Sequence, residues 1–237
     1  MDDHDLNEHL CLLTARRLGL PSAKSQVMTF GTERVIVVER YDRRSVEGEY
    51  RRVHQEDLCQ ALGRTPSQKY QADGGPSPEE IGRLLQTHVR PMERAAADVA
   101  TFVDALALNW LIAGTDAHAK NYSVLLANQQ VRLAPLYDVA SMLSYNEHVP
   151  KLKSAMKIGG EYRLGLIASR HWRRVAEGLG LDAEVVLERV AVMTERVPEA
   201  VARAAGTPEV VALGSDLPAR LVDRVGEWAA TCRAALG

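Results

Sequence analysis

The strongest helical pattern of the chain spans residues 92–113, MERAAADVATFVDALALNWLIA. Its apolar residues recur at helical spacing and become denser toward Trp110, Leu111 and Ile112. A helix that is apolar on all sides is buried. We therefore predict a central helix over residues 92–113 that ends deep in the core, so that the segment after it is held rigidly.

A hairpin is predicted after this helix. Residues 122–126 and 131–133 are short β patterns on either side of Asn128-Gln129-Gln130. The loop before the hairpin reads GTDAHAKN (114–121), and PLYD (135–138) follows it. The polar residues therefore gather at both ends of one hairpin.

Two acids and an amide in these loops suggest a metal site. Asp116 and Asn121 share one tight loop, and the hairpin returns the chain so that Asp138 can face them. Mg²⁺ favours one or two carboxylate or amide oxygens together with phosphates and water. The segment therefore suits an oxygen-ligand Mg²⁺ site.

The D-x-x-x-x-N spacing of Asp116 and Asn121 equals that of the protein-kinase catalytic loop. In that loop the Asp accepts the substrate proton and the Asn binds a metal, and Asp138 would take the part of the DFG aspartate. The spacing also occurs by chance. The alternatives are a helix C-terminal turn at Asp116 with Asn121 in left-handed conformation, and an Asx-turn at Asp138.

The rest of the chain is mainly helical. Further helices are predicted at residues 7–18, at 56–62, from Ser77 onward, and near 164–178, 182–196, 198–205 and 217–235. A first hairpin is predicted from residues 26–30 and 34–39, and its second strand is apolar enough to be buried on both faces. Residues 65–78 form a long loop of the kind that is often functional or mobile.

The composition is that of a folded chain with no strong bias toward nucleic acid or membrane. The chain has 237 residues, with 46% hydrophobic and 25% charged residues and a net charge of -2. Residues 151–174 are locally basic, which allows a weak DNA contact but fits a solvated face better. With no run of about 20 apolar residues and an acidic start, we expect a cytoplasmic protein.

Cysteine and histidine usage argues against other kinds of site. The three cysteines (Cys11, Cys59 and Cys232) are widely spaced, so we expect buried thiols. The seven histidines are scattered, so a His/Cys transition-metal centre is not expected.

The residues NWLIAGTDAHAKNYSVLL followed by APLYDVAS resemble the C-terminal part of the HipA-like serine/threonine kinases, the toxins of bacterial type II toxin–antitoxin systems. The resemblance continues in NEHLCLLTARRLGLP, VIVVERYDRR and HQEDLCQALGRTPSQKYQADGGP. It implies an α+β, mostly helical fold with two small antiparallel hairpins, the C-terminal lobe of a fold similar to protein and phosphoinositide kinases.

The resemblance also implies residue roles. Asp116 would be the catalytic base, and Asn121 and Asp138 would bind Mg²⁺. The residues expected to contact ATP are Glu39, Arg40, Tyr41, His118, Ala119, Lys120, Asn121, Tyr137 and Asp138. Among them, Lys120 would compensate the transferred charge. Tyr41 could instead be a core aromatic, Lys120 a solvated side chain, and residues 39–44 a surface run of alternating charge.

Two elements of the family pattern, both of which bind ATP phosphates, are not found in this sequence. No glycine-rich phosphate loop and no lysine-bearing strand lies upstream of Asn7. We expect residues 1–54 to be a remnant of the N-terminal lobe and hinge, and residues 55–237 to be the helical C-terminal lobe. A separate protein would then supply the missing lobe, and Glu8, which would pair with the absent lysine, would be solvated.

Two functions remain open at this stage. One is a kinase that phosphorylates a protein serine, and the resemblance implies an aminoacyl-tRNA synthetase as its substrate. The other is an inactive helical module that binds a DNA-binding antitoxin of the HipB type.

Overall fold

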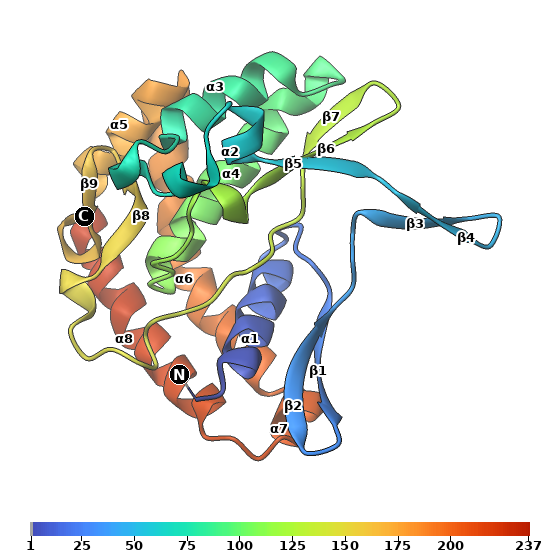
Figure 1. The fold of residues 1–237 in the computed structure, drawn as a ribbon. Coiled ribbons are helices and arrows are strands. Elements are labelled where there is room, and N and C mark those ends of the chain that lie inside the picture. The colour runs from blue at the N-terminus through green and yellow to red at the C-terminus, as the bar shows by residue number, and fades with distance from the viewer. Residues whose placement is uncertain (1) are drawn as a thin grey trace.

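The computed structural model describes residues 2–237 and shows a helical body with short β ribbons around it (Figure 1). The helices are α1 (His4–Arg17), α2 (Leu58–Ala61), α3 (Pro78–His88), α4 (Ala95–Leu111), α5 (Ser169–Leu179), α6 (Ala183–Ala205), α7 (Pro208–Val211) and α8 (Leu217–Leu236). Short 3₁₀ turns include η1 (Pro66–Gln68), η2 (Gln71–Asp73), η3 (Met92–Arg94) and η4 (Ala119–Asn121). None of the helices within residues 2–237 combines the length and the apolar character needed to cross a bilayer.

The strands form small antiparallel sheets. They are β1 (Ser25–Phe30), β2 (Glu33–Val38), β3 (Arg43–Val46), β4 (Glu49–Arg52), β5 (His54–Asp57), β6 (Ser123–Ala127), β7 (Gln130–Leu133), β8 (Lys153–Ile158) and β9 (Glu161–Arg163). β1 pairs with β2, β3 with β4 and β8 with β9, while β5, β6 and β7 form one three-stranded sheet. The β3–β4 hairpin projects away from the helical body (Figure 1).

Helix α4 lies at the centre of the helical body, where it packs against α3, α6 and α8. Trp110, near its end, is fully buried, and the Trp110 indole donates a hydrogen bond to the Leu164 carbonyl at 3.1 Å. The Trp228 indole in turn donates to the Trp110 carbonyl at 2.8 Å. The predicted burial of the end of the central helix is confirmed, and the following loop starts from a fixed point.

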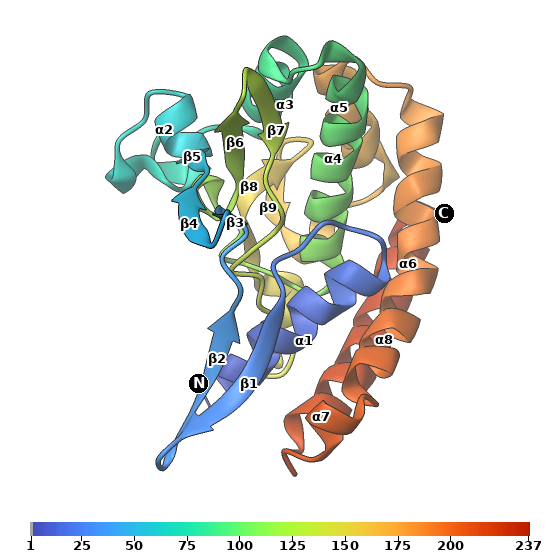
Figure 2. The same ribbon diagram turned by 90° about the vertical axis from the view of Figure 1, so that its right-hand side faces the viewer.

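Helix α1 shares the core of the later helices. It crosses α6 and α8, which run side by side (Figure 2). Leu6 and Leu10 of α1 belong to the same buried cluster as Val197 of α6 and Val225 of α8. The division of the chain at residue 54 therefore stays a prediction, because the packing of α1 does not follow it.

Several local predictions are confirmed. Ser77 caps α3, because its hydroxyl accepts from the Glu80 N–H at 3.2 Å while the Glu80 carboxylate accepts from the Ser77 N–H at 2.9 Å. The hairpin after α4 forms as predicted, with Val124 opposite Leu133. The α+β, mostly helical fold class is confirmed.

The structure contains more hairpins than the two that the sequence predicted. The β3–β4 and β8–β9 hairpins were missed, and β5 adds a third strand to β6–β7. Each missed hairpin turns through two residues with positive φ, Glu47-Gly48 and Gly159-Gly160. Such pairs are typical of tight hairpin turns, but β3, β4 and β9 have only three or four residues, most of them polar, which concealed the signal.

The predicted burial of β2 on both faces is wrong. Its residues from Arg34 to Val38 are only half-buried, and Glu33 is exposed. β2 has β1 as its strand neighbour and α1 packed against it, and no further sheet within residues 2–237 covers the ribbon. An apolar strand can be buried on both faces, but it is buried only where other elements of the chain pack against it.

Two predicted helix boundaries are also wrong. Helix α6 continues through Pro198, where the sequence suggested a break. An interior proline costs about 3 kcal/mol or more in a helix. Val197 and Val201, on either side of it, are buried against the core, and this packing offsets that cost. The helix predicted at 56–62 is shorter because residues 54–57 pair with β6 as β5.

Candidate active site

The loop after α4 and the segment after β7 are joined by one amide. The Asn121 Nδ2 donates to the backbone carbonyl of Asp116 at 3.1 Å and to that of Asp138 at 3.2 Å. Asn121 is buried, whereas the Asp116 and Asp138 side chains are exposed. The main chain of the two predicted acids therefore meets at one buried amide, and both acids have exposed side chains.

This arrangement orients the amide oxygen. Both donor hydrogens of Asn121 are used, and no group within residues 2–237 donates to its Oδ1. That oxygen is therefore the atom that Asn121 can offer to a ligand. Asn121 belongs to η4 and does not have the positive φ of the alternative interpretation.

Asp138 adopts the left-handed conformation, with φ of 54°. A non-glycine residue in this region carries a cost of order 1–3 kcal/mol and persists only where its surroundings fix it. Within residues 2–237 its carboxylate forms neither the hydrogen bond of an Asx-turn nor an ion pair. Asp138 therefore presents an exposed carboxylate that has no partner among residues 2–237.

Glu8 of α1 lies beside Asp138 and is half-buried, so the prediction of a solvated Glu8 is wrong. Burial raises the pKa of Glu8, the charge of Asp138 raises it further, and a backbone hydrogen bond from Asp138 opposes the shift. Within residues 2–237 neither carboxylate has a cationic partner. Two such groups form a donor set that fits a hard divalent cation.

The protein ligands would fill only part of a coordination shell. Among residues 2–237 no cluster of three or more His, Cys, Asp or Glu side chains could hold a metal. Mg²⁺ usually keeps several waters and takes further ligands from substrate phosphates. The residues present therefore fit Mg²⁺ bound together with a nucleotide better than a metal bound by protein alone.

A cavity of about 400 Å³ opens next to Asp138 and is called the Asp138 cavity here. It is lined by Glu8, Val38, Glu39, Arg40, Tyr41, Gln55, Tyr137 and Asp138. Five of these residues were predicted to contact ATP, and they come from two distant parts of the sequence. The Gln55 Oε1 in its wall is buried and has no hydrogen-bond partner among residues 2–237, so it is available to a ligand.

Two tyrosines stand together in this cavity. The rings of Tyr41 and Tyr137 lie 5.9 Å apart between centroids, and both are half-buried rather than core residues. The Tyr137 hydroxyl donates to the Lys120 carbonyl at 2.6 Å and lies 2.6 Å from the Ser123 hydroxyl. Tyr137 therefore connects the cavity to the loop that carries Asp116.

Glu39 and Arg40 form ion pairs with residues that do not line the cavity. Glu39 pairs with Lys24 at 3.2 Å, and the Arg40 guanidinium makes two bonds of 2.8 Å to the buried carboxylate of Asp42. The carboxylate of Asp42 also accepts from Arg43 at 2.5 Å. Within residues 39–44, Glu39 thus forms one exposed ion pair, and Arg40 and Arg43 pair with the buried acid Asp42.

The predicted ATP contacts at residues 118–121 and the predicted base Asp116 do not line the Asp138 cavity. The Lys120 Nζ lies 2.8 Å from the Asp57 carboxylate, which raises the pKa of Lys120, so this side chain is paired rather than merely solvated. His118 is buried, which lowers its pKa, and its Nδ1 has no partner among residues 2–237. Ala119 is buried and its N–H donates to the Lys69 carbonyl.

Sequence reasoning did not single out Gln55, Asp57 or Tyr70 as site residues. Tyr70 comes from the loop between α2 and α3, and its hydroxyl donates to the Asp116 Oδ1. All three residues lie in the HQEDLCQALGRTPSQKYQADGGP stretch that carries part of the family resemblance. The family resemblance of that stretch marked it as part of the site. The contacts of these three residues, however, are with residues far apart in sequence, and no local pattern predicts them.

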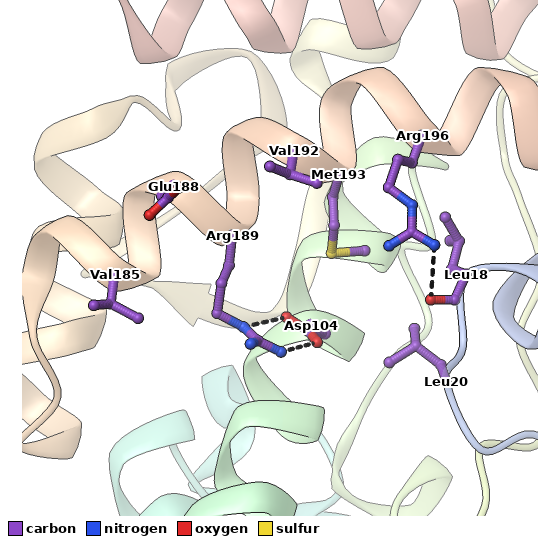
Figure 3. Close-up of a pocket in the computed structure, with 9 residues that line it drawn as sticks. All are labelled: Leu18, Leu20, Asp104, Val185, Glu188, Arg189, Val192, Met193 and Arg196. Atoms are coloured by element: carbon purple, nitrogen blue, oxygen red, sulfur yellow. Dashed lines mark hydrogen bonds and ion pairs between the residues drawn. The ribbon is translucent and has the colours of Figure 1, made fainter.

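A second pocket, called the Asp104 groove here, lies along α6 (Figure 3). It is lined by Leu18, Leu20, Asp104, Val185, Glu188, Arg189, Val192, Met193 and Arg196. The Arg189 guanidinium makes two bonds to Asp104, at 3.0 and 2.5 Å. Arg196 donates to the Leu18 carbonyl at 3.4 Å. Both central charges are satisfied internally, so the Asp138 cavity is the stronger candidate for an active site.

Comparison with known proteins agrees with the fold. The sequence model of the HipA-like C-terminal domain matches residues 1–201. The putative kinase Y4mE of Sinorhizobium fredii is 37% identical over 198 residues, which is 83% of this chain and 46% of that protein. The serine/threonine-protein kinase toxin HipA of Shewanella oneidensis is 30% identical over 207 residues, 83% of this chain and 47% of that protein. The chain thus spans about half the length of these curated relatives.

Two solved structures have a similar fold. HipA in the Shewanella oneidensis complex of HipA, HipB and operator DNA has a TM-score of 0.80 and 24% identity, covering 98% of this chain and 58% of that one. The Helicobacter pylori proinflammatory kinase CtkA has a TM-score of 0.60 and 11% identity, covering 99% of this chain and 83% of that one. The predicted kinase-like lobe is therefore confirmed as a fold.

Proposed function

Because the chain belongs to the HipA-like C-terminal domain family, we propose that it forms the catalytic portion of a protein serine/threonine kinase. The reaction transfers the γ-phosphate of ATP to a hydroxyl group of a protein. The observation that carries the proposal is the Asn121 amide, which bonds the main chain of both Asp116 and Asp138. One buried side chain thereby keeps a base and a metal ligand in register.

In this proposal Asp116 takes the proton of the acceptor hydroxyl, and its exposure suits a protein substrate. The Asn121 Oδ1 and the Asp138 carboxylate hold Mg²⁺, with Glu8 near by. When bound, Mg²⁺ supplies positive charge against the phosphates. Phosphoryl transfer is catalysed mainly by positioning and charge stabilisation, so the fixed loop matters as much as the identity of the base.

We assign the base of ATP to the Asp138 cavity, where Tyr41 and Tyr137 supply aromatic surface and Gln55 supplies an unpartnered acceptor. The phosphates then lie toward residues 118–121. Lys120 can compensate transferred charge if it exchanges its Asp57 partner for a phosphate. His118, with a lowered pKa, acts as a neutral hydrogen-bonding group.

The proposal also involves the region of the relatives that this chain does not match. The family resemblance implies a glycine-rich loop and a strand lysine that hold the β- and γ-phosphates, and the relatives extend well beyond the matched region. We assign those elements to that region, whether it is joined to this chain or is a separate protein. Without them transfer should be slower by orders of magnitude.

The partners proposed follow from the relatives. A HipB-like helix-turn-helix antitoxin is proposed because the Shewanella HipA was solved with HipB and operator DNA. The basic residues of 151–174 that are exposed and unpaired within residues 2–237 are Lys151, Lys153, Arg163, Arg170 and Arg174, and they would give at most a weak DNA contact. An aminoacyl-tRNA synthetase is the proposed class of substrate, on the family resemblance alone.

Transfer of labelled phosphate from ATP to casein tests the function. We expect no substantial transfer by the 237-residue chain alone and clear transfer when it is mixed with the N-terminal half of the Sinorhizobium fredii relative. Asp116→Ala should lower that transfer by about 10²–10⁴-fold by removing the base, whereas Asp223→Ala, at an exposed acid of α8, should leave it unchanged.

Two results would contradict parts of this proposal. Robust transfer by the isolated chain would remove the role given to the other half of the relatives. Absence of transfer in both samples, with retained binding to an antitoxin, would favour the non-enzymatic binding module.

A further inference from the structure

The Asp116 side chain is exposed and has one hydrogen-bond partner within residues 2–237, the Tyr70 hydroxyl. The phenol donates to Oδ1, which leaves Oδ2 without an intramolecular partner. An exposed carboxylate that lacks such a contact turns freely about its terminal torsion. Tyr70 is therefore the group that restricts the orientation of this carboxylate.

Tyr70 is itself held against the loop that carries Asp116. Its ring meets the His118 ring edge to face, with 5.1 Å between centroids and 76° between planes. The preceding carbonyl, of Lys69, accepts from the Ala119 N–H at 3.2 Å. Besides the hydrogen bond to Asp116, these two contacts therefore join the loop after α2 to the loop after α4.

The turn behind Tyr70 is closed. Its carbonyl accepts from the Asp73 N–H at 3.0 Å and from the Gly75 N–H at 2.9 Å. A β-carbon at Gly75 would lie 2.6 Å from the Tyr70 carbonyl oxygen and 2.3 Å from that of Gln68, so the turn requires glycine there. Further along, the Gln71 side chain accepts from the Lys157 N–H at 2.6 Å, which ties the turn to β8. This bracing suits a fixed support better than a gate.

On the basis of the proposed kinase function, we propose that Tyr70 is a positioning residue that holds one oxygen of Asp116 so that the other faces the acceptor hydroxyl. In the transfer, the acceptor oxygen forms a bond to the γ-phosphorus, and the bond from that phosphorus to the ADP oxygen breaks with its electron pair leaving on ADP. The acceptor proton passes to the Asp116 Oδ2. Tyr70 neither gains nor loses a proton.

The chemistry of the phenol agrees with a donor role. The hydrogen bond to Asp116, with burial and the charge of that carboxylate, raises the pKa of Tyr70 to about 12. The phenol therefore stays protonated at neutral pH and remains a donor to the base. A competing role would be a pseudosubstrate, in which the Tyr70 hydroxyl occupies the place of the acceptor and must be displaced.

The test compares Tyr70→Phe with Tyr162→Phe in the mixture that transfers phosphate. The two tyrosines are well matched, because both are half-buried and each lies under a lysine, Lys69 at 4.9 Å and Lys157 at 5.2 Å from the ring centroid. We expect Tyr70→Phe to lower kcat by roughly tenfold, the scale of one lost hydrogen bond to a charged group, with KM for ATP and Tm unchanged. Tyr162→Phe should change none of these quantities.

The Asp116→Asn variant completes a double-mutant cycle. If Tyr70 acts through the Asp116 carboxylate, Tyr70→Phe should cause no further loss of kcat in the Asp116→Asn background. An equal loss in both backgrounds would overturn the proposal, as would an unchanged kcat in Tyr70→Phe. A raised kcat would overturn it in favour of the pseudosubstrate. If the parent mixture transfers no phosphate at all, the proposed function fails and the role of Tyr70 fails with it.

Discussion

The Asp138 cavity and the Asp104 groove have nearly the same volume, about 400 and 390 Å³, but they treat charge in opposite ways. In the groove, Asp104 and Arg189 satisfy each other through two hydrogen bonds. In the cavity, Glu8 and Asp138 lie side by side and neither has an ion-pair partner among residues 2–237, since the one arginine of the lining, Arg40, is paired with Asp42. A half-buried charge such as that of Glu8 is costly unless something else binds it, so the comparison favours the cavity over the groove as the proposed binding site.

The largest expected effect is on nucleotide binding. Asp138→Ala should reduce the affinity for Mg·ATP by about a hundredfold or more, because it removes the charged group that we propose as a metal ligand. Asp104→Ala should leave that affinity unchanged, since its carboxylate is paired at a distance from the cavity. Calorimetric titration of both variants makes the measurement. Equal affinities in the parent chain and in Asp138→Ala would refute the metal assignment and the distinction between the two pockets.

An intermediate effect is expected on the stability of the fold when the Asp104–Arg189 ion pair of the groove is removed. Asp104→Ala should lower the free energy of unfolding by about 1 kcal/mol, the upper end for a partly exposed ion pair with two-point geometry. Urea denaturation measures it, and Arg203→Ala, which breaks an exposed pair with Glu199 on α6, serves as the control with a smaller loss. A larger loss in the control would show that the groove pair is no better satisfied than an ordinary surface pair.

The smallest effect concerns Glu8 and depends on pH. Its pKa is raised in the folded chain, so the folded state carries a penalty when Glu8 is ionised, and this penalty disappears as pH falls below the ordinary glutamate range. Glu8→Gln should therefore be slightly more stable than the parent chain at pH 7 and equal to it near pH 4. Denaturation without Mg²⁺ at both pH values checks this. A variant that is less stable at pH 7 would mean that Glu8 stabilises the cavity as an anion.

Local patterns predicted much of this molecule. The Ser77 cap depends on residues three positions apart, and the contact of the Asn121 amide with the main chain of Asp116 and Asp138 depends on one loop and the hairpin after it. Both follow from spacing along the chain, which is why sequence could anticipate them. The chemical roles of these residues stay predictions.

The long-range contacts could not be predicted in the same way. The hydroxyl of Tyr70 meets Asp116 across 46 positions, and the packing that keeps α6 continuous through Pro198 comes from other helices. The half-exposure of β2 likewise depends on what lies beside it and not on its own apolar residues. In each case the local preference of the sequence was outweighed by packing that only the folded chain defines.

The amide of Asn121 has a consequence for the ageing of the protein. Deamidation would exchange its nitrogen for an oxygen, a change that hardly alters the shape of the side chain. It would, however, replace two donors by an acceptor that repels the carbonyl oxygens of Asp116 and Asp138. The durability of the site over the lifetime of a molecule therefore depends on the chemical persistence of a single amide group.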